Sequence, residues 1–407
     1  EVEIQSIFRK HDVRLEFPEK VLKEAKQASV EISKEERAQR KNLTDWMIFT
    51  IDGERAMDFD DAVSIEKMGD GYRLGVHIAD VSHYVQEGSP LDEEAYLRGT
   101  SIYFPNGVIP MLPFELSNEI CSLKPREERL TLSALIDFDD KGEMLGFSIF
   151  DSFIKSQYRF TYTQVARMLE KDTADAQHKP AFPSLKTMHE LAQILRKRRF
   201  RLGSVDFNVP EPEIVLDDKG NVEKIVKAEH NVAHELIEEF MLSANQVVAR
   251  HLASKDVPLI HRIHESPDEA KLSAFNDFVK VFGYHLKESN TPNSLDLQNL
   301  LKKAKGRPEE RVVNTLLLRS MKKAKYSTLD PGHFCLAFEH YTHFTSPIRR
   351  YPDLIIHRLV KSFHKRKCSA NEGKALYPRI RDYADQSSFK EEKAMLVERE
   401  MNDLLRT

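Results

Sequence analysis

The chain has 407 residues, of which 41% are hydrophobic and 31% are charged, and its formal net charge is −4 at pH 7. These proportions are typical of a folded globular protein and argue against a disordered chain, and no run of about 18 or more apolar residues predicts a membrane span. A net charge close to zero also excludes binding of nucleic acid through the field of the whole molecule, so such a partner would need a local basic lining.

The first 160 residues carry a pattern that predicts a largely antiparallel sheet. Residues 18–40 are rich in Glu, Lys and Ala and favour a helix, which leads into a strand-like segment at 46–51. The turns MGDG at 68–71 and DDKG at 139–142 each separate two alternating segments, as in a β-hairpin.

Helices dominate the pattern after Thr163, which is a candidate N-cap for the helix QVARMLE. No Gly/Ser linker or charge block divides the chain, and its weakest point is the polar stretch 171–184, so we expect one domain. The fold class predicted is α+β, with a mixed, largely antiparallel sheet in the N-terminal part surrounded by helices from the C-terminal part. A helix is expected at 184–202, followed by a hairpin-like pair at 213–226 and by further helices at 232–253, 267–283, 295–305 and 308–325.

Four aspartates crowd the segment that follows the predicted strand at 46–51: Asp52, Asp58, Asp60 and Asp61. Carboxylates this close repel one another, and burial would favour their protonated forms unless a cation compensates. Mg²⁺ suits such a site because it binds a few carboxylates and leaves other positions to water and substrate phosphate. We therefore expect a divalent metal site here, for Mg²⁺ or alternatively Mn²⁺.

Hairpin turns, calcium loops and phosphatase nucleophiles also contain paired aspartates, but this acidic segment fits them less well. The pairs 139–140 and 217–218 each precede Lys-Gly between strand-like runs and are typical of hairpin turns, whereas Phe59 interrupts the clustered aspartates and a strand-like run follows them. An EF-hand loop counted from Asp58 would need Gly and Glu where the sequence has Val63 and Gly69. A phosphatase nucleophile pair fits Asp-Phe-Asp at 58–60, but the preceding GERAM is not the apolar strand that it requires.

A second polar cluster lies in the segment HFTSPIRRYPD at 343–353, a loop that enters a helix. The hydroxyls of Thr345 and Ser346 and the guanidiniums of Arg349 and Arg350 suit phosphate oxygens, which accept the planar arginine fork in pairs. Alone, the arginines would fit surface ion pairs equally well, and the acidic segment shifts the balance toward phosphoryl chemistry.

Basic and histidine-rich stretches elsewhere carry weaker signals. The run 196–201 is typical of a solvated helix end, although it could follow a nucleic-acid backbone. The pairs His261/His264 and His340/His343 are spaced for one metal face, but such pairs are usually structural.

The segments TIDGERAMDFDDAV and HFTSPIRRYPDLIIHR resemble the signature segments of the ribonuclease II and ribonuclease R family of 3′-to-5′ exoribonucleases. Blocks similar to those of the family occur in the same order at 99–125, 160–165, 234–245 and 317–327, so the resemblance covers essentially the whole chain. It implies magnesium-dependent, processive hydrolysis of single-stranded RNA from the 3′ end, with release of nucleoside 5′-monophosphates.

The resemblance also implies roles for particular residues. The four aspartates would hold Mg²⁺ and the attacking water, with Asp60 and Arg349 as the catalytic residues. Tyr103 matches the aromatic residue that the family stacks on a terminal base, and Glu239 falls in its nucleotide-contacting helix. The full set of expected RNA contacts is Tyr103, Phe207, Glu239, Thr345, Ser346, Arg350 and Glu398.

The family flanks this type of domain with cold-shock and S1 RNA-binding domains, so we expect residues 1–407 to be a single RNB-type catalytic domain, a fragment without them. Three widely spaced cysteines fit a reducing compartment, and we expect a monomeric cytoplasmic protein with single-stranded RNA as its partner and no membrane association. Two alternatives stay open from the sequence. One is an RNA-binding module without turnover, and the other is a DNA exonuclease.

Overall fold

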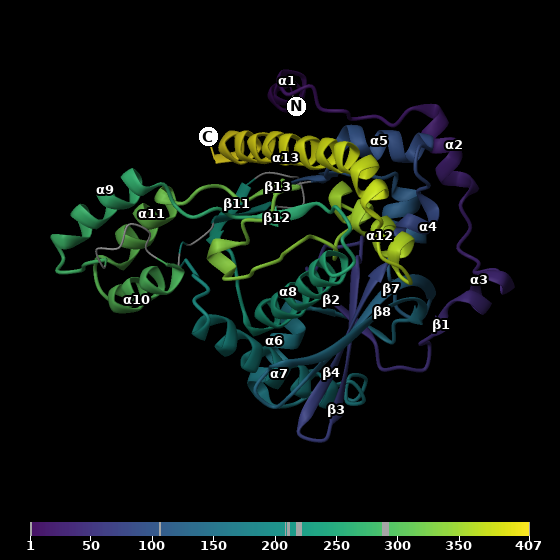
Figure 1. Cartoon of the computed structure of the whole chain (residues 1–407), viewed down its shortest axis with the longest axis horizontal. Helices are drawn as coiled ribbons and strands as arrows, with labels where there is room; N and C mark the ends of the chain where they lie inside the picture. The colour runs from purple at the N-terminus through teal and green to yellow at the C-terminus, as the bar shows by residue number, and fades with distance from the viewer. Residues whose placement is uncertain are drawn as a thin grey trace.

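The computed structural model describes residues 2–105, 107–207, 209, 212–216, 222–286 and 293–406, and a seven-stranded sheet forms its centre (Figure 1). The two edge pairs of this sheet are parallel and the inner pairs are antiparallel, which confirms the predicted mixed, largely antiparallel sheet. Across the sheet the order is β1 (Lys41–Asn42), β8 (Met144–Lys155), β7 (Glu128–Phe138), β4 (Gly71–Ala79), β3 (Asp61–Met68), β2 (Phe49–Asp52) and β9 (Tyr158–Thr161).

Both predicted hairpins of the central sheet are present, and local chemistry explains their turns. Between β3 and β4, Gly69 takes a φ of 61°, a left-handed conformation that glycine adopts without strain. Between β7 and β8, Asp139 Oδ1 accepts the backbone N–H groups of Lys141 (2.9 Å) and Glu143 (2.7 Å), as a turn aspartate does. The predicted pair at 213–226 forms β10 (Pro212–Leu216) and β11 (Val222–Lys227), and its expected Asp-Asp turn lies outside the described residues.

Helices pack against this sheet in the manner expected of an α+β fold. The helix α8 (Val232–Ala253) has the bounds that the sequence predicts, and α7 (Phe182–Arg201) lies between it and β3. The first strands and these helices share one large apolar core, which also receives α12 (Tyr351–Phe363). This core therefore fixes the end of the sheet where β2 finishes and β3 begins.

Two predictions for helices in the N-terminal half were wrong, one on helix bounds and one on an N-cap. The helix expected at 18–40 is divided into α2 (Glu19–Gln27) and α3 (Lys34–Gln39), because Ser33 caps a new helix by accepting the Glu36 N–H at 3.1 Å. The N-cap of α6 (Tyr162–Lys171) is Thr161 instead of Thr163. Its hydroxyl accepts the backbone N–H of Gln164, whose side chain in turn accepts the N–H of Thr161.

Three helices form a group with an apolar cluster of its own, seen to one side of the sheet in Figure 1. They are α9 (Glu269–Lys280), α10 (Ser294–Ala304) and α11 (Glu310–Ser320). The last is shorter than the helix predicted at 308–325, because the chain then forms β13 (Lys325–Ser327), which pairs with β12 (His261–Ile263).

The long helix α13 (Ala370–Arg406) runs along one side of the molecule with α1 (Val2–Lys10) beside its C-terminal part (Figure 1). These helices and β5 (Ile102–Phe104) share a small apolar cluster. No helix within the described ranges combines the length and apolar character needed to cross a bilayer. The remaining elements are α4 (Val81–Tyr84), α5 (Pro90–Arg98), β6 (Gly107–Ile109), the π-helix Glu115–Ile120 and the 3-10 helix Phe334–Leu336.

A buried cluster of charges ties the sheet to α12. Asp80, at the end of β4, is 1% exposed and accepts Arg40 Nη2 at 2.6 Å and Lys361 Nζ at 2.5 Å. The hydroxyl of Ser82 donates to its other oxygen at 2.7 Å. Burial alone would raise the pKa of Asp80, but Lys361 and Arg40 hold it well below the ordinary value.

We expect Asp80→Ala to lower the free energy of unfolding by about 3–5 kcal/mol at pH 7, because two cations would lose their buried partner. Because the folded pKa of Asp80 is depressed, its contribution is present above the unfolded pKa of about 3.9 and is lost at lower pH. Urea denaturation at several pH values should therefore show that the difference in free energy of unfolding between Asp80→Ala and the parent chain becomes smaller below about pH 4. The control is Asp403→Ala, which removes exposed ion pairs with Arg399 and Arg406 and should cost about 0–1 kcal/mol; equal losses in both variants would contradict the assignment.

Candidate active site

The four clustered aspartates lie at one end of the central sheet. Asp52 is the last residue of β2, Asp61 is the first of β3, and Asp58 and Asp60 lie in the connection between them. Because β2 and β3 are antiparallel neighbours, the connection returns to the end of the sheet from which it leaves. The fold thus gathers the aspartates that the sequence singles out.

The electrostatics of these carboxylates are those of crowded, desolvated acids. Burial raises the pKa of Asp52 well above its usual value, and the nearby Asp61 raises it further. Burial also raises the pKa of Asp60 well above the usual value and that of Asp61 to about 6, against the opposing charge of Arg349. Asp52 Oδ2 is buried, and it has no hydrogen-bond partner within the described part of the chain.

This donor set fits a hard divalent cation. A cation would relieve the repulsion between the carboxylates and give the unpartnered Asp52 oxygen a ligand. Among the described residues, no three or more His, Cys, Asp or Glu side chains lie close enough together to form a metal-binding group by themselves. An open arrangement is nevertheless what Mg²⁺ needs, since it is held by one or two carboxylates together with water and phosphate oxygens.

The loop at 343–350, the arginine loop, comes from the C-terminal half of the chain and contacts the aspartates. The backbone N–H of Ile348 donates to Asp60 Oδ1 at 2.8 Å, and Arg349 Nε lies 3.8 Å from Asp60 Oδ2. The guanidinium of Arg349 also donates to Ser346 Oγ at 3.0 Å, and its side chain is 42% exposed. Arg349 is therefore a cation beside the carboxylates that keeps an accessible face.

The other polar residues of this loop are less accessible. Thr345 and Ser346 are 3% and 5% exposed. Arg350 donates from Nη2 to Asp353 Oδ1 at 2.8 Å, and its Nε is buried. The side chains of Thr345, Ser346 and Arg350 thus pack inside the loop, although RNA contacts were predicted for them. Arg349 is the accessible member of the arginine pair.

Tyr103 and Glu398 meet at the acidic segment, although they lie far from it in sequence. The hydroxyl of Tyr103 donates to Asp58 Oδ2 at 2.8 Å, while its backbone N–H donates to Glu398 Oε1 at 3.0 Å. Tyr103 is 40% exposed, which argues against a tyrosine filling the core and leaves ring surface free for stacking. Glu398, on α13, thus holds the strand that carries Tyr103.

Two other predicted RNA contacts have different partners. Glu239, on α8, is 3% exposed and accepts Arg199 Nη2 at 2.5 Å, a buried ion pair. Phe207 packs against the apolar cluster of α9, α10 and α11. The basic run at 196–201 is also engaged, because Arg198 pairs with Glu143 and Arg196 with Asp206.

The structure adds side chains that sequence reasoning did not single out. Tyr162 begins α6, and burial raises the pKa of its hydroxyl, with a further contribution from the charges of Asp61 and Asp52. Its ring stacks on His234 with 3.9 Å between centroids. Arg159 donates to the carbonyl oxygens of Gly53 (2.5 Å) and Glu54 (3.1 Å) and so holds the start of the acidic segment. The sequence did carry a signal for Tyr162, because it lies in the segment FTYTQV at 160–165, which resembles a family block. Arg159 directly precedes that segment, in β9, the strand that pairs with β2.

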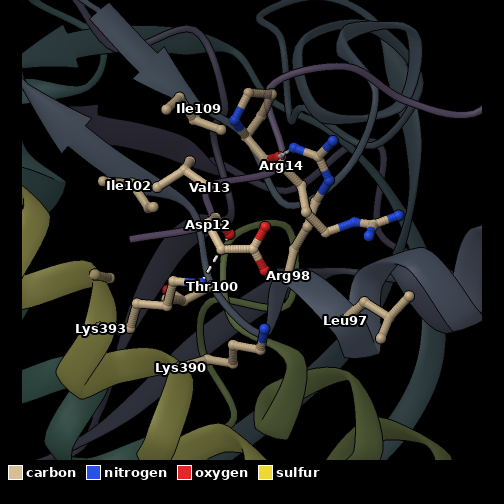
Figure 2. A pocket seen from close by; sticks show the side chains of 12 residues that line it. Asp12, Val13, Arg14, Leu97, Arg98, Thr100, Ile102, Ile109, Lys390 and Lys393 are labelled. Atoms are coloured by element: carbon tan, nitrogen blue, oxygen red, sulfur yellow. Dashed lines mark hydrogen bonds between the residues drawn. The ribbon is translucent and has the colours of Figure 1, made fainter. Parts of the chain in front are cut away.

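The backbone of Arg349 is anchored from behind by the strand segment next to α5. Ser101 N–H and the Thr100 hydroxyl donate to the Arg349 carbonyl at 2.9 and 3.1 Å. Thr100 also lines a small pocket of about 30 Å³, shown in Figure 2. Asp12 and Lys393 line the same pocket, where Lys393 Nζ donates to the Asp12 carbonyl at 2.8 Å and so joins the N-terminal segment to α13.

Comparison with known proteins shows which family the chain resembles. The RNB domain matches residues 40–366. The chain is 43% identical to "Ribonuclease R 1" of Lactococcus lactis over 408 residues, 99% of the chain and 50% of that protein. It is 44% identical to "Ribonuclease R" of Aquifex aeolicus over 362 residues, 88% of the chain and 51% of that protein. The chain thus spans about half the length of these curated relatives.

Solved structures share the whole fold. Mycoplasma genitalium RNase R in complex with ribose-methylated single-stranded RNA superposes with a TM-score of 0.93 at 33% identity, covering 100% of this chain and 64% of that one. Yeast Ssd1, a pseudonuclease, shares the fold with a TM-score of 0.79 at 24% identity, covering 98% of this chain and 49% of that one. The family match extends over most of the chain and includes the acidic segment and the arginine loop, so this chain belongs to the RNB domain family.

Proposed function

We propose that this chain catalyses the magnesium-dependent, processive hydrolysis of single-stranded RNA from its 3′ end and releases nucleoside 5′-monophosphates. The observation that carries the proposal is the contact of the arginine loop with Asp60, through Ile348 N–H at 2.8 Å and Arg349 Nε at 3.8 Å. It brings metal-binding carboxylates and a phosphate-binding guanidinium to one place. Family membership and the RNA complex of the Mycoplasma genitalium protein support this function.

In the mechanism that we propose, each group of residues has one physical task. Asp52, Asp58, Asp60 and Asp61 would hold Mg²⁺, or alternatively Mn²⁺, near the scissile phosphate. When bound, the divalent ion lowers the pKa of a water and offsets charge on the phosphate. Arg349, aligned by its bond to Ser346 Oγ, would stabilise charge that develops on the non-bridging oxygens.

The RNA contacts are proposed on separate grounds. Tyr103 is supported by its exposed ring next to Asp58, and Glu398 by its bond to the Tyr103 backbone. Thr345, Ser346 and Arg350 are supported by their position in the arginine loop. Phe207 and Glu239 rest on the family resemblance, and contact with RNA by Glu239 would require its carboxylate to serve Arg199 and the ligand together.

The functional unit, the oligomeric state and the cellular location are proposed as well. We propose that residues 1–407 act as one catalytic unit, that the protein is monomeric, and that it works in the cytoplasm. The apolar core shared by the sheet, α8 and α12 supports the first of these. Sedimentation and cell fractionation would test the other two.

Asp60→Asn tests the function directly, because it removes one metal-directed charge with little change of shape. With 5′-labelled single-stranded RNA and Mg²⁺, the parent chain should give a ladder that shortens from the 3′ end, and a chelator should stop it. The variant should lose most turnover while RNA binding in the presence of the chelator stays near that of the parent. Full activity of Asp60→Asn would refute the metal site, and RNA binding by the parent without any shortening would favour an RNA-binding module instead. A matched single-stranded DNA substrate tests the choice of sugar.

Arg349→Lys should be damaging although it keeps the charge. An ammonium cannot reproduce the planar fork that reaches both Ser346 Oγ and a phosphate. Loss of one transition-state donor typically costs about 2.7–4 kcal/mol, so single-turnover rates should fall about 10²- to 10³-fold. RNA affinity measured alongside should change little, and a variant whose only defect is weaker binding would make Arg349 a tethering residue.

Tyr103→Ala should leave the degradation of long RNA almost unchanged but should end with longer limit oligonucleotides. Base stacking on an aromatic ring is worth roughly 1–3 kcal/mol, and a short product has few other contacts to replace it. Tyr103→Phe is the matched control, because it keeps the ring and loses only the hydroxyl bond to Asp58. Gel sizing of end products decides the matter: identical limit products from Tyr103→Ala and the parent would argue against stacking.

A further inference from the structure

The middle of the arginine loop depends on a residue outside it. Near the start of the loop, Phe344 is held by α8 and α12, since its N–H donates to Asn245 Oδ1 and its carbonyl accepts His357 Nε2, both at 2.8 Å. Near its end, the Arg349 carbonyl accepts Ser101 N–H at 2.9 Å. Between these anchors the chain must turn so that Ile348 N–H reaches Asp60.

Asp353 holds this turn in place. Its Oδ1 accepts both the backbone N–H of Ser346 and Arg350 Nη2, each at 2.8 Å, so one oxygen joins the beginning and the end of the turn. The residue is 0% exposed. It lies in the first turn of α12, where the helix dipole favours a carboxylate.

The same turn orients the catalytic side chain. Ser346, whose N–H is fixed by Asp353, presents Oγ to Arg349 Nη2 at 3.0 Å, and its carbonyl accepts the N–H of Arg350 at 3.0 Å. A shift of Ser346 would therefore move the guanidinium of Arg349. It would also move the Ile348 N–H that lies 2.8 Å from Asp60 Oδ1.

We infer that Asp353 is a positioning residue for the proposed hydrolysis, holding the turn at 346–350 so that Arg349 and the Ile348 N–H both face Asp60. Asp353 itself contacts the loop and not the reacting atoms, so this inference rests on the proposed function. A misplacement of about 1 Å can cost about 10²-fold in rate, which sets the size of the effect to be sought.

A matched control is available on another helix that contacts α12. Asp92 lies in the first turn of α5, is 5% exposed, accepts the backbone N–H of Gly88 at 2.8 Å and pairs with Arg358 at 2.8 Å. Like Asp353 it is a buried carboxylate that holds one backbone N–H and one arginine; it also accepts the Tyr351 hydroxyl at 3.0 Å, and the loop that it caps at Gly88 is separate from the loop that contacts Asp60. Loss of either residue should cost stability, but only Asp353 should control the rate.

The experiment measures single-turnover rate, RNA affinity and melting temperature for the parent chain, Asp353→Ala and Asp92→Ala at a temperature where all are folded. We expect both variants to melt at a lower temperature, while only Asp353→Ala loses rate, by about 10²-fold, with RNA affinity within a few-fold of the parent. Equal rate losses in the two variants, or a parent-like rate in Asp353→Ala, would overturn the inference alone. Absence of hydrolysis by the parent chain would overturn the proposed function and this inference with it.

A second pair of variants keeps the test decisive if Asp353→Ala does not fold. Asp353→Asn retains an oxygen acceptor at the same reach, whereas Asp353→Glu retains the charge but displaces the acceptor by one methylene. Positioning through the Ser346 N–H predicts a faster rate for Asp353→Asn than for Asp353→Glu. The reverse order would mean that charge opposite Arg350 is what matters, and it would overturn the inference.

Discussion

The hydrogen bond from Ile348 N–H to Asp60 Oδ1 joins two segments that are 288 residues apart, and the candidate site exists only where they meet. One oxygen of Asp60 binds the loop, and the other lies 3.8 Å from Arg349 Nε. Burial raises the pKa of Asp60, and Arg349 opposes that shift. The arginine loop therefore keeps the pKa of Asp60 lower than burial alone would make it.

The aspartates are buried and close together, which favours a cation site over a solvated acidic loop. Asp52 Oδ2 is buried and lacks a hydrogen-bond partner within the described residues, and burial raises the pKa of Asp61 to about 6. A divalent ion of the kind that we propose would compete with protons for these carboxylates, since its binding requires their ionised forms. Arg159 and Tyr103 hold the connection between β2 and β3 in place through the Gly53 carbonyl and the Asp58 carboxylate.

Sequence reasoning succeeded where the determinants are local. The hairpin turns, the bounds of α8 and the clustering of the aspartates follow from residues within a few positions of one another. It missed one local signal, because Thr161 and Gln164 cap each other within three positions and so make Thr161 the N-cap instead of Thr163. It failed where a distant partner decides: Glu239 is buried in an ion pair with Arg199, on a neighbouring helix.

The two adjacent arginines show this limit of local reasoning within a single motif. Arg350 has an extended backbone, with φ −134° and ψ 124°, and in extended chain successive side chains point to opposite sides. One guanidinium must therefore face the aspartates while the other faces away, and the backbone pairing of Arg350 with Thr100 decides which. Arg349 keeps an exposed face beside Asp60, and Arg350 is committed to Asp353. By residue type alone, the two arginines are equivalent candidates for binding phosphate. The segment at Thr100 and Ser101, which pairs with their backbone, gives them different roles.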